Sequence, residues 1–276
     1  MLSDITLGQY FPGKSLLHKL DPRMKLILAA IYMVAVFLAN NAFCHLFMTL
    51  FTLSLVLLSR ISFSIVLRAV RPILYVLIFT MLLNLFFTRA DGGHLLVDFW
   101  IIRIYSEGVF RALFMALRVV LLVIGVSVLL TYTTTPIALT DAIESLLSPL
   151  KIIRVPVHEF AMMMTIALRF IPTLIEETEK IMNAQKARGA DFTSGSIFRR
   201  VKALVPILIP LFVSSFQRAI DLATAMECRC YRGGKGRTKL IRYTLHLRDF
   251  AMLLLFAASI AAIVLGNRHL PIGRLY

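Results

Sequence analysis

The chain has 276 residues, of which 59% are hydrophobic, and its formal net charge is +15. Apolar runs of about 17 or more residues are typical of transmembrane helices, so the composition excludes a soluble globular protein and indicates a polytopic α-helical membrane protein. The excess of Lys and Arg is typical of the cytoplasmic loops of such proteins, and no aromatic-rich basic motif accompanies it, which argues against nucleic-acid binding.

Five apolar segments predict membrane spans, and three of them lie in the first third of the chain. Residues 24–40 and 43–59 are both near the short limit for crossing a bilayer. A polar Asn-Asn pair between them predicts a tight turn, so we expect the two to form a helical hairpin. Residues 60–71 are expected to be a charged connector that leads into a third span at residues 72–87.

The stretch that follows, residues 88–108, is polar except for an apolar run at residues 95–104. We expect this run to be a re-entrant or interfacial segment. A fourth span is predicted at residues 109–132, and it stops at the Thr-Thr-Thr-Pro run of residues 133–136. The fifth span is predicted at residues 250–266, close to the C-terminus.

The distribution of basic residues predicts the orientation of these spans. The N-terminal segment, the connector at 60–71 and the region 136–248, which holds 17 Lys and Arg, are all basic, whereas residues 88–108 contain only two basic residues. We therefore expect a cell-membrane protein with a cytoplasmic N-terminus and an external C-terminus. The predicted domains are an N-terminal membrane domain of four spans at 1–135, a cytoplasmic helical domain at 136–248, and a last span with an external tail at 249–276.

Apolar periodicity predicts four helices within the cytoplasmic region. Pro172 is expected to end the second of them, and Gly189 to cap the third in a left-handed conformation. Arg218 and Arg229 are eleven residues apart, close to three helical turns, and should share one face of the fourth. The expected helices run from Thr140 or Asp141 to Pro149, over 159–171, from Thr173 to Gly189, and over 207–230.

Two of these helices end in similar short motifs, Ala187-Arg188-Gly189 and Cys228-Arg229-Cys230. Basic residues near helix C-termini are common and often contribute only about 0.3–1 kcal/mol of stability. A guanidinium group is also suited to bidentate pairing with a carboxylate in a partner's groove. No phosphate-binding loop, nucleophile motif or metal-ligand spacing occurs in the chain, so we expect no catalysis, metal or cofactor on this polypeptide.

Four segments together give the chain a resemblance to a known family: residues 18–25, the Thr-Pro exit of the fourth span, residues 187–189 and residues 225–234. On these segments, and over nearly its whole length, the chain resembles the transmembrane T component of energy-coupling-factor (ECF) transporters. The resemblance implies an all-α membrane scaffold with about five transmembrane helices and a cytoplasmic helical coupling domain.

The resemblance also implies the partners and the coupling residues. Two cytoplasmic ABC ATPase subunits would bind ATP and Mg²⁺, and a small membrane S component in the bilayer would capture a vitamin or another micronutrient. Two Ala-Arg-Gly motifs of the family dock into the ATPases, which assigns that role here to Ala187, Arg188 and Gly189 and to Cys228, Arg229 and Cys230. The second motif departs from the family pattern, because cysteines replace both small residues.

Arg118 lies about ten residues into the fourth span, where a charge is expensive. Either it reaches the outer interface along its aliphatic stem, or it contacts a partner inside the membrane, for which Asn84 and Glu107 are candidates. Two other functions stay open. A self-contained secondary transporter would need paired acids within the spans, and a membrane enzyme of lipid metabolism would need an acidic metal-binding cluster, neither of which the sequence contains.

Overall fold

The computed structural model describes residues 10–87, 95–99, 102–190, 192, 196–233 and 243–269. The described parts form two compact units, a bundle unit and an α7–α8 unit. The bundle unit comprises residues 8–142 and 243–276, and the α7–α8 unit comprises residues 143–242 together with the first seven residues.

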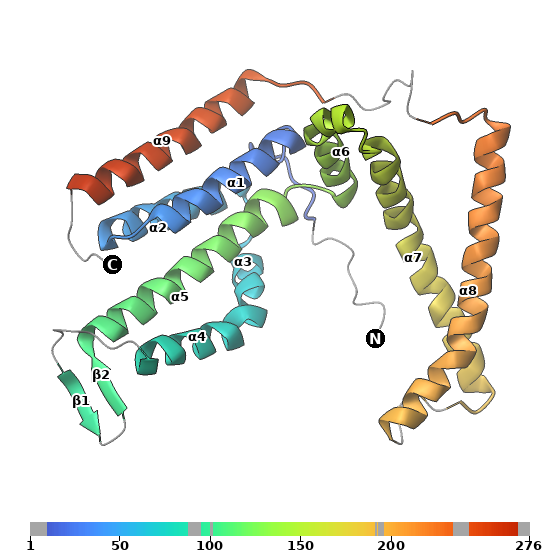
Figure 1. Cartoon of the computed structure of the whole chain (residues 1–276), viewed down its shortest axis with the longest axis horizontal. Coiled ribbons are helices and arrows are strands. Elements are labelled where there is room, and N and C mark those ends of the chain that lie inside the picture. Colours follow the sequence, from blue (N-terminus) through green and yellow to red (C-terminus); the bar gives the residue numbers. More distant parts are fainter. Residues whose placement is uncertain are drawn as a thin grey trace. The chain divides into compact units, whose positions relative to one another are not determined.

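Four helices make up most of the bundle unit and lie side by side in Figure 1: α1 (Pro22–Leu38), α2 (Ala42–Ser59), α5 (Ser106–Val126) and α9 (Leu247–His269). Helix α1 packs against α5 and α9, and α2 packs against α5. Helix α1 begins where the sequence allows it, because Pro22 occupies the first turn and the Asp21 carboxylate accepts the backbone N–H of Arg23 at 2.8 Å.

The core between these helices is centred on Tyr32 of α1, which is fully buried. Its hydroxyl donates to the carbonyl oxygen of Leu121 in α5 at 2.9 Å and forms a second hydrogen bond with the Thr52 hydroxyl of α2 at 2.7 Å. Gly125 faces the Tyr32 ring so closely that a Cβ there would lie 2.2 Å from a ring carbon. The packing of α1 on α5 therefore requires a glycine at this position.

The expected charged connector at residues 60–71 is not a loop. Most of it is helix α3 (Phe63–Val70), which continues through a 3₁₀ turn, η1 (Arg71–Ile73), into α4 (Leu74–Phe87). The apolar side chains between the arginines sustain the helix, so the span begins earlier than predicted.

The apolar run at residues 95–104 contributes strands β1 (Leu95–Phe99) and β2 (Ile102–Tyr105) of an antiparallel hairpin. In the strand register, position 98 lies opposite position 103. The segment that we expected to be re-entrant or interfacial thus takes the form of a β-hairpin, because the run is short and rich in β-branched and aromatic residues. Apart from this hairpin, the described regular structure is helical, which confirms the predicted all-α class.

Six helical segments of the described chain are long and apolar enough to cross a membrane, which agrees roughly with the prediction of about five. Four of them match expected spans: α2, the combined segment Phe63–Asn84, the segment Gly108–Thr131, and α9. The other two are α7 and α8, which we expected on the cytoplasmic side. The first expected span, α1, has only 17 residues. The number of long apolar helices among the described residues shows that the chain is a multi-pass membrane protein.

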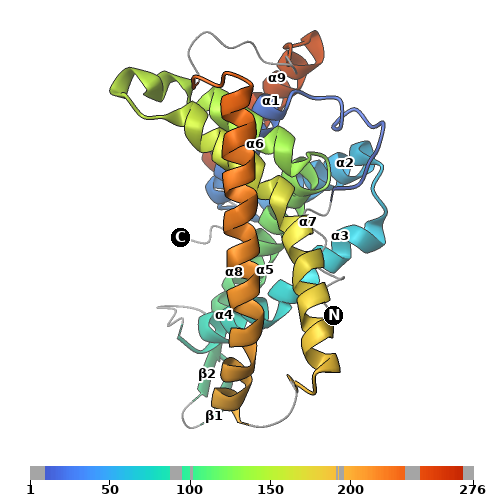
Figure 2. The same cartoon turned by 90° about the vertical axis from the view of Figure 1, so that its right-hand side faces the viewer.

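Helix α5 ends in a π-helical turn, η2 (Ser127–Thr131), and the chain then enters α6 (Pro136–Leu146), the 3₁₀ turn η3 (Ser148–Ile153), α7 (Val157–Ala187) and α8 (Ile197–Cys228). Helix α6 begins at Pro136 and not at the predicted Thr140 or Asp141, since Thr135 accepts the N–H of Ala138 through its hydroxyl. In Figures 1 and 2, α7 and α8 run in opposite directions.

Prolines do not end the helices of the α7–α8 unit, contrary to our expectation. Pro172 lies inside the 31-residue α7, so the two helices predicted on either side of it are one. Helix α8 contains Pro206 and Pro210 and begins ten residues before the predicted start. An interior proline removes one backbone hydrogen bond, and the long ladders on both sides keep these helices continuous.

Candidate functional site

The first motif forms the C-terminal end of α7. Ala187 is its last helical residue, and the N–H of Arg188 still bonds to the carbonyl oxygens of Ala184 and Gln185 at 3.2 and 3.1 Å. Gly189 has φ +87°, so it takes the left-handed conformation that was predicted. The N–H of Ala190 then bonds to the carbonyl oxygen of Gln185 at 3.0 Å, which closes a Schellman cap. All three motif residues are exposed.

The second motif ends α8 in the same way, although its sequence differs. Cys230 takes the left-handed conformation, with φ +55°. Its N–H bonds to the carbonyl oxygen of Glu227 at 2.8 Å, and the N–H of Tyr231 bonds to the carbonyl oxygen of Met226 at 3.1 Å, as Ala190 does with Gln185. Cys228, Arg229 and Cys230 are exposed. The cysteines therefore allow the same type of cap that Gly189 closes at the end of α7.

The two arginines are presented at opposite ends of the antiparallel helices α7 and α8. An ion pair of 2.9 Å between Arg218 of α8 and Glu177 of α7 connects the two helices between their ends. At 1.5 Å per residue, the 31 residues of α7 extend over about 46 Å. Among the described residues, neither Arg188 nor Arg229 forms an ion pair, so both guanidinium groups are available to another molecule.

Arg229 also borders a cavity that the sequence did not reveal. The cavity has a volume of about 480 Å³ and is lined by Met162 and Ile166 from the start of α7, by Leu222 and Met226 from the end of α8, and by residues 229–233. It is a shallow apolar recess with the cationic side chains of Arg229 and Arg232 at its border. The contribution of α7 to this cavity depends on the antiparallel packing of the two helices, which the sequence alone does not predict.

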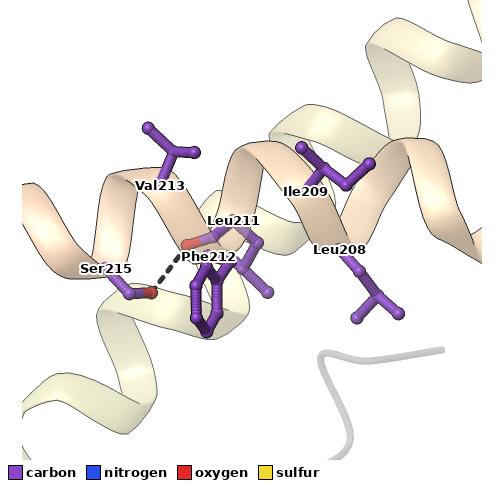
Figure 3. Close-up of a pocket in the computed structure, with 6 residues that line it drawn as sticks. All are labelled: Leu208, Ile209, Leu211, Phe212, Val213 and Ser215. Carbon is purple, nitrogen blue, oxygen red and sulfur yellow. Dashed lines mark hydrogen bonds between the residues drawn. The ribbon is translucent and has the colours of Figure 1, made fainter.

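The middle of α8 carries a second, apolar hollow, which Figure 3 shows in close-up. It is lined by Leu208, Ile209, Leu211, Phe212, Val213 and Ser215. The one hydroxyl of the group is internally satisfied, because Ser215 donates to the carbonyl oxygen of Leu211 at 2.7 Å. Phe212 is 64% exposed, and such a large exposed apolar face indicates contact with lipid or with another protein.

Arg118 is largely buried within the bundle unit. It is only 8% exposed, and its guanidinium group donates to the carbonyl oxygen of Ala39 and to the side-chain oxygen of Asn40 at 3.4 Å. Arg118 thus holds the α1–α2 turn against α5. Asn84, one of the two suggested partners, donates to Thr80 of its own helix instead, and the side chain of Glu107 lies outside the described residues.

The described residues contain no group of three or more His, Cys, Asp or Glu side chains that could hold a metal ion. Two pairs of ionisable side chains lie within the α7–α8 unit among the described residues. His158 at the start of α7 contacts the Glu144 carboxylate of α6 at 3.1 Å, and Arg218 contacts Glu177. These pairs fix the helices and leave the two helix ends exposed.

Comparison with known proteins gives consistent matches over most of the chain. The family model of a cobalt transport protein, CbiQ, matches residues 13–240. An energy-coupling factor transporter transmembrane protein EcfT from Ruminiclostridium cellulolyticum is 55% identical over 246 residues, which cover 88% of this chain and 91% of the relative. Proteins of the same name from Clostridium kluyveri and Bacillus subtilis are 51% and 50% identical, over 96% and 87% of this chain and 95% and 89% of the relatives.

Proposed function

Since this chain belongs to the CbiQ and EcfT family of transporter transmembrane proteins, the T components of ECF transporters, we propose that it is the scaffold that couples ATP hydrolysis by separate subunits to import. The observation that carries the proposal is the pair of equivalent caps at the two ends of one helix pair, where Arg188 and Arg229 form no ion pair with any residue that the structure describes. A part that receives motion from two soluble subunits needs two such contact points.

Two cytoplasmic ABC ATPases dock on these ends, one on each. A forked guanidinium group pairs bidentately with a carboxylate, and the exposed cap lets the backbone of the helix end enter a groove. The distance of about 46 Å along α7 favours two subunits over one. ATP and Mg²⁺ are bound and used in the ATPases, and this chain contributes no catalytic residue and no cofactor.

The remaining apolar surfaces face the bilayer and the S component. Only 6% of the residues in the span Phe63–Asn84 are buried within the chain, against 39% in α2, so most of that span lies against lipid or a second membrane protein. The exposed apolar face of α8 around Phe212 is the other such surface. The S component captures the vitamin or other micronutrient outside, and closure of the ATPases moves α7 and α8 and thereby the S component.

We place α7 and α8 on the cytoplasmic side although both are apolar enough to span. Both are flanked by the basic residues of the region 136–248, and α7 has the least apolar window of the six candidates. The spans are then α1, α2, the segment Phe63–Asn84, α5 and α9. An odd number of spans puts the two termini on opposite sides, and the basic residues before the first span then place the N-terminus in the cytoplasm and the C-terminus outside.

The test is gentle affinity purification of the tagged chain from its native membrane, with the co-purifying chains identified by mass spectrometry. We expect two ABC ATPases and at least one small membrane protein to co-purify with the wild type. In the double variant Arg188→Glu with Arg229→Glu, we expect the amount of co-purifying ATPase to fall at least tenfold. Arg169→Glu is the matched control, because Arg169 is exposed in the middle of α7 and its reversal changes the charge equally. Undiminished ATPases in the double variant would refute the docking role.

A further inference from the structure

Residues 143–242, which contain α7 and α8, are joined to the bundle unit by the chain at two places, one at each end of this segment. One is within α6, between Ala142 and Ile143, and the other is between Arg242 and Tyr243. The first connection follows the Thr-Thr-Thr-Pro exit of α5, and the second leads into α9. A displacement of α7 and α8 that is carried by the chain must therefore enter the bundle through these two connections.

The first connection is held by a buried lysine of α1. Lys25 is 2% exposed, and its ammonium group donates to the carbonyl oxygen of Thr133 at 2.7 Å. The residue before Thr133 is held as well, because the carbonyl oxygen of Tyr132 accepts the N–H of Phe11 at 3.1 Å. These two hydrogen bonds come from outside the helix. They fix a stretch whose preceding turn, η2, is π-helical and departs from the regular α-helical hydrogen-bond ladder.

The second connection is held by the residue that begins α1. Asp249, in the first turn of α9, is 1% exposed, and its carboxylate accepts the N–H of Asp21 at 3.0 Å and the N–H of His246 at 2.8 Å. Burial, together with the nearby carboxylates of Asp141 and Asp21, raises the pKa of Tyr243. Tyr243 of the second connection thus lies near Asp141 of the first, and both connections converge on the start of α1.

Packing alone does not require a charge at this place. Burying an ammonium group is costly, and the cost is offset only where opposite charges and hydrogen bonds face it. Around Lys25 those groups are the carboxylates of Asp21 and Asp249 and the carbonyl oxygen of Thr133. Each of the three belongs to a different part of the junction, namely the cap of α1, the start of α9 and the exit of α5. The lysine therefore links all three, which an apolar residue of the same volume would not do.

We propose that residues 21–25, with Lys25 as the positioning residue, are the anchor that ties both chain connections to α1 and α9, so that movement of α7 and α8 is delivered to the bundle. The inference rests on the proposed function, since it needs ATPases that move α7 and α8. It also gives a role to the residues at the start of α1, which the docking of Arg188 and Arg229 does not use.

The experiment is amide hydrogen–deuterium exchange on the complex as purified with its ATPases, with and without a non-hydrolysable ATP analogue. In the wild type, the analogue should change exchange in α7 and α8 and also in α1 and α9. In Lys25→Met, we expect the change in α7 and α8 to persist, the change in α1 and α9 to fall at least threefold, and exchange around Thr133 to rise at least tenfold. Lys25→Arg should restore part of the response.

Two controls separate the anchor from a general loss of folding and from failure of the proposed function. Lys19→Met removes an exposed lysine just before α1, and the complex that carries it should respond to the ATP analogue as the wild type does. Asp249→Asn keeps the size of the side chain and should weaken the response in the same direction as Lys25→Met. A Lys25→Met complex that retains its ATPases and shows the wild-type response in α1 and α9 would overturn the anchor. A wild-type chain that brings down no ATPase would instead overturn the proposed function, and the anchor with it.

Discussion

At the level of single residues, left-handed backbone conformations close the two helix ends that we propose as docking sites. Gly189 and Cys230 close the same cap on α7 and α8, with φ of +87° and +55°. A glycine adopts this region freely, whereas a residue with a Cβ pays about 1 kcal/mol or more to do so. Cys230 is therefore held there by its hydrogen bonds, and the exposed arginine before it is displayed in the same way as Arg188.

Gly189→Ala tests whether the cap depends on backbone conformation alone. No atom lies within 4 Å of a Cβ built at this position, so steric crowding predicts no effect, whereas the positive φ predicts a loss of about 1 kcal/mol in the free energy of closing the cap. We expect amide exchange at Arg188 and Ala190 to rise about fivefold. Cys230→Gly, the reverse change, should slow exchange at Tyr231 or leave it unchanged. Equal exchange in Gly189→Ala and the wild type would show that the conformation is not strained.

At the scale of elements, the sequence predicted helix ends better than helix continuity. Gly189 was correctly expected to cap α7, because a glycine after the last apolar position is a local signal. Pro172 was wrongly expected to break the same helix, since a proline only removes one hydrogen bond and the rest of a 31-residue helix outweighs that loss. The start of α3 at residue 63 was also missed, because the arginines in this stretch interrupt the apolar pattern of the helix.

The contact between α1 and α5 gives a prediction at this scale. Gly125 lies against the ring of Tyr32, where a Cβ would be 2.2 Å from a ring carbon, and the Tyr32 hydroxyl bonds to both α2 and α5. Gly125→Ala should therefore separate the helices and lower the stability of the bundle by about 1–3 kcal/mol, the usual cost of overpacking. Thermal unfolding in detergent measures this. Tyr32→Leu combined with Gly125→Ala should be more stable than the sum of the two single changes predicts, and simple additivity would contradict the contact.

For the whole molecule, composition and periodicity predicted the membrane class, the helical fold and the two exposed motifs. The contacts that organise those helices were not predictable, because they join residues far apart in the chain. Arg118 bonds to Ala39, and Lys25 bonds to Thr133 over 108 positions, and a single sequence carries no local signal for either pairing. For Arg118 the sequence left two readings open, and neither included the contact with the α1–α2 turn that the packing of α5 creates.

The separation of Arg188 and Arg229 leads to a prediction about assembly. If each arginine docks one ATPase, Arg188→Glu and Arg229→Glu should deplete different partners, because the two ends of α7 are about 46 Å apart and one groove does not reach both. Quantitative mass spectrometry of complexes purified without nucleotide gives the ratio of the two ATPases in each variant. We expect the ratio to shift at least threefold in opposite directions, and Arg169→Glu to leave it unchanged. Depletion of the same ATPase by both variants would mean that a single subunit contacts both helix ends, and the scaffold would then transmit the motion of one motor and not of two.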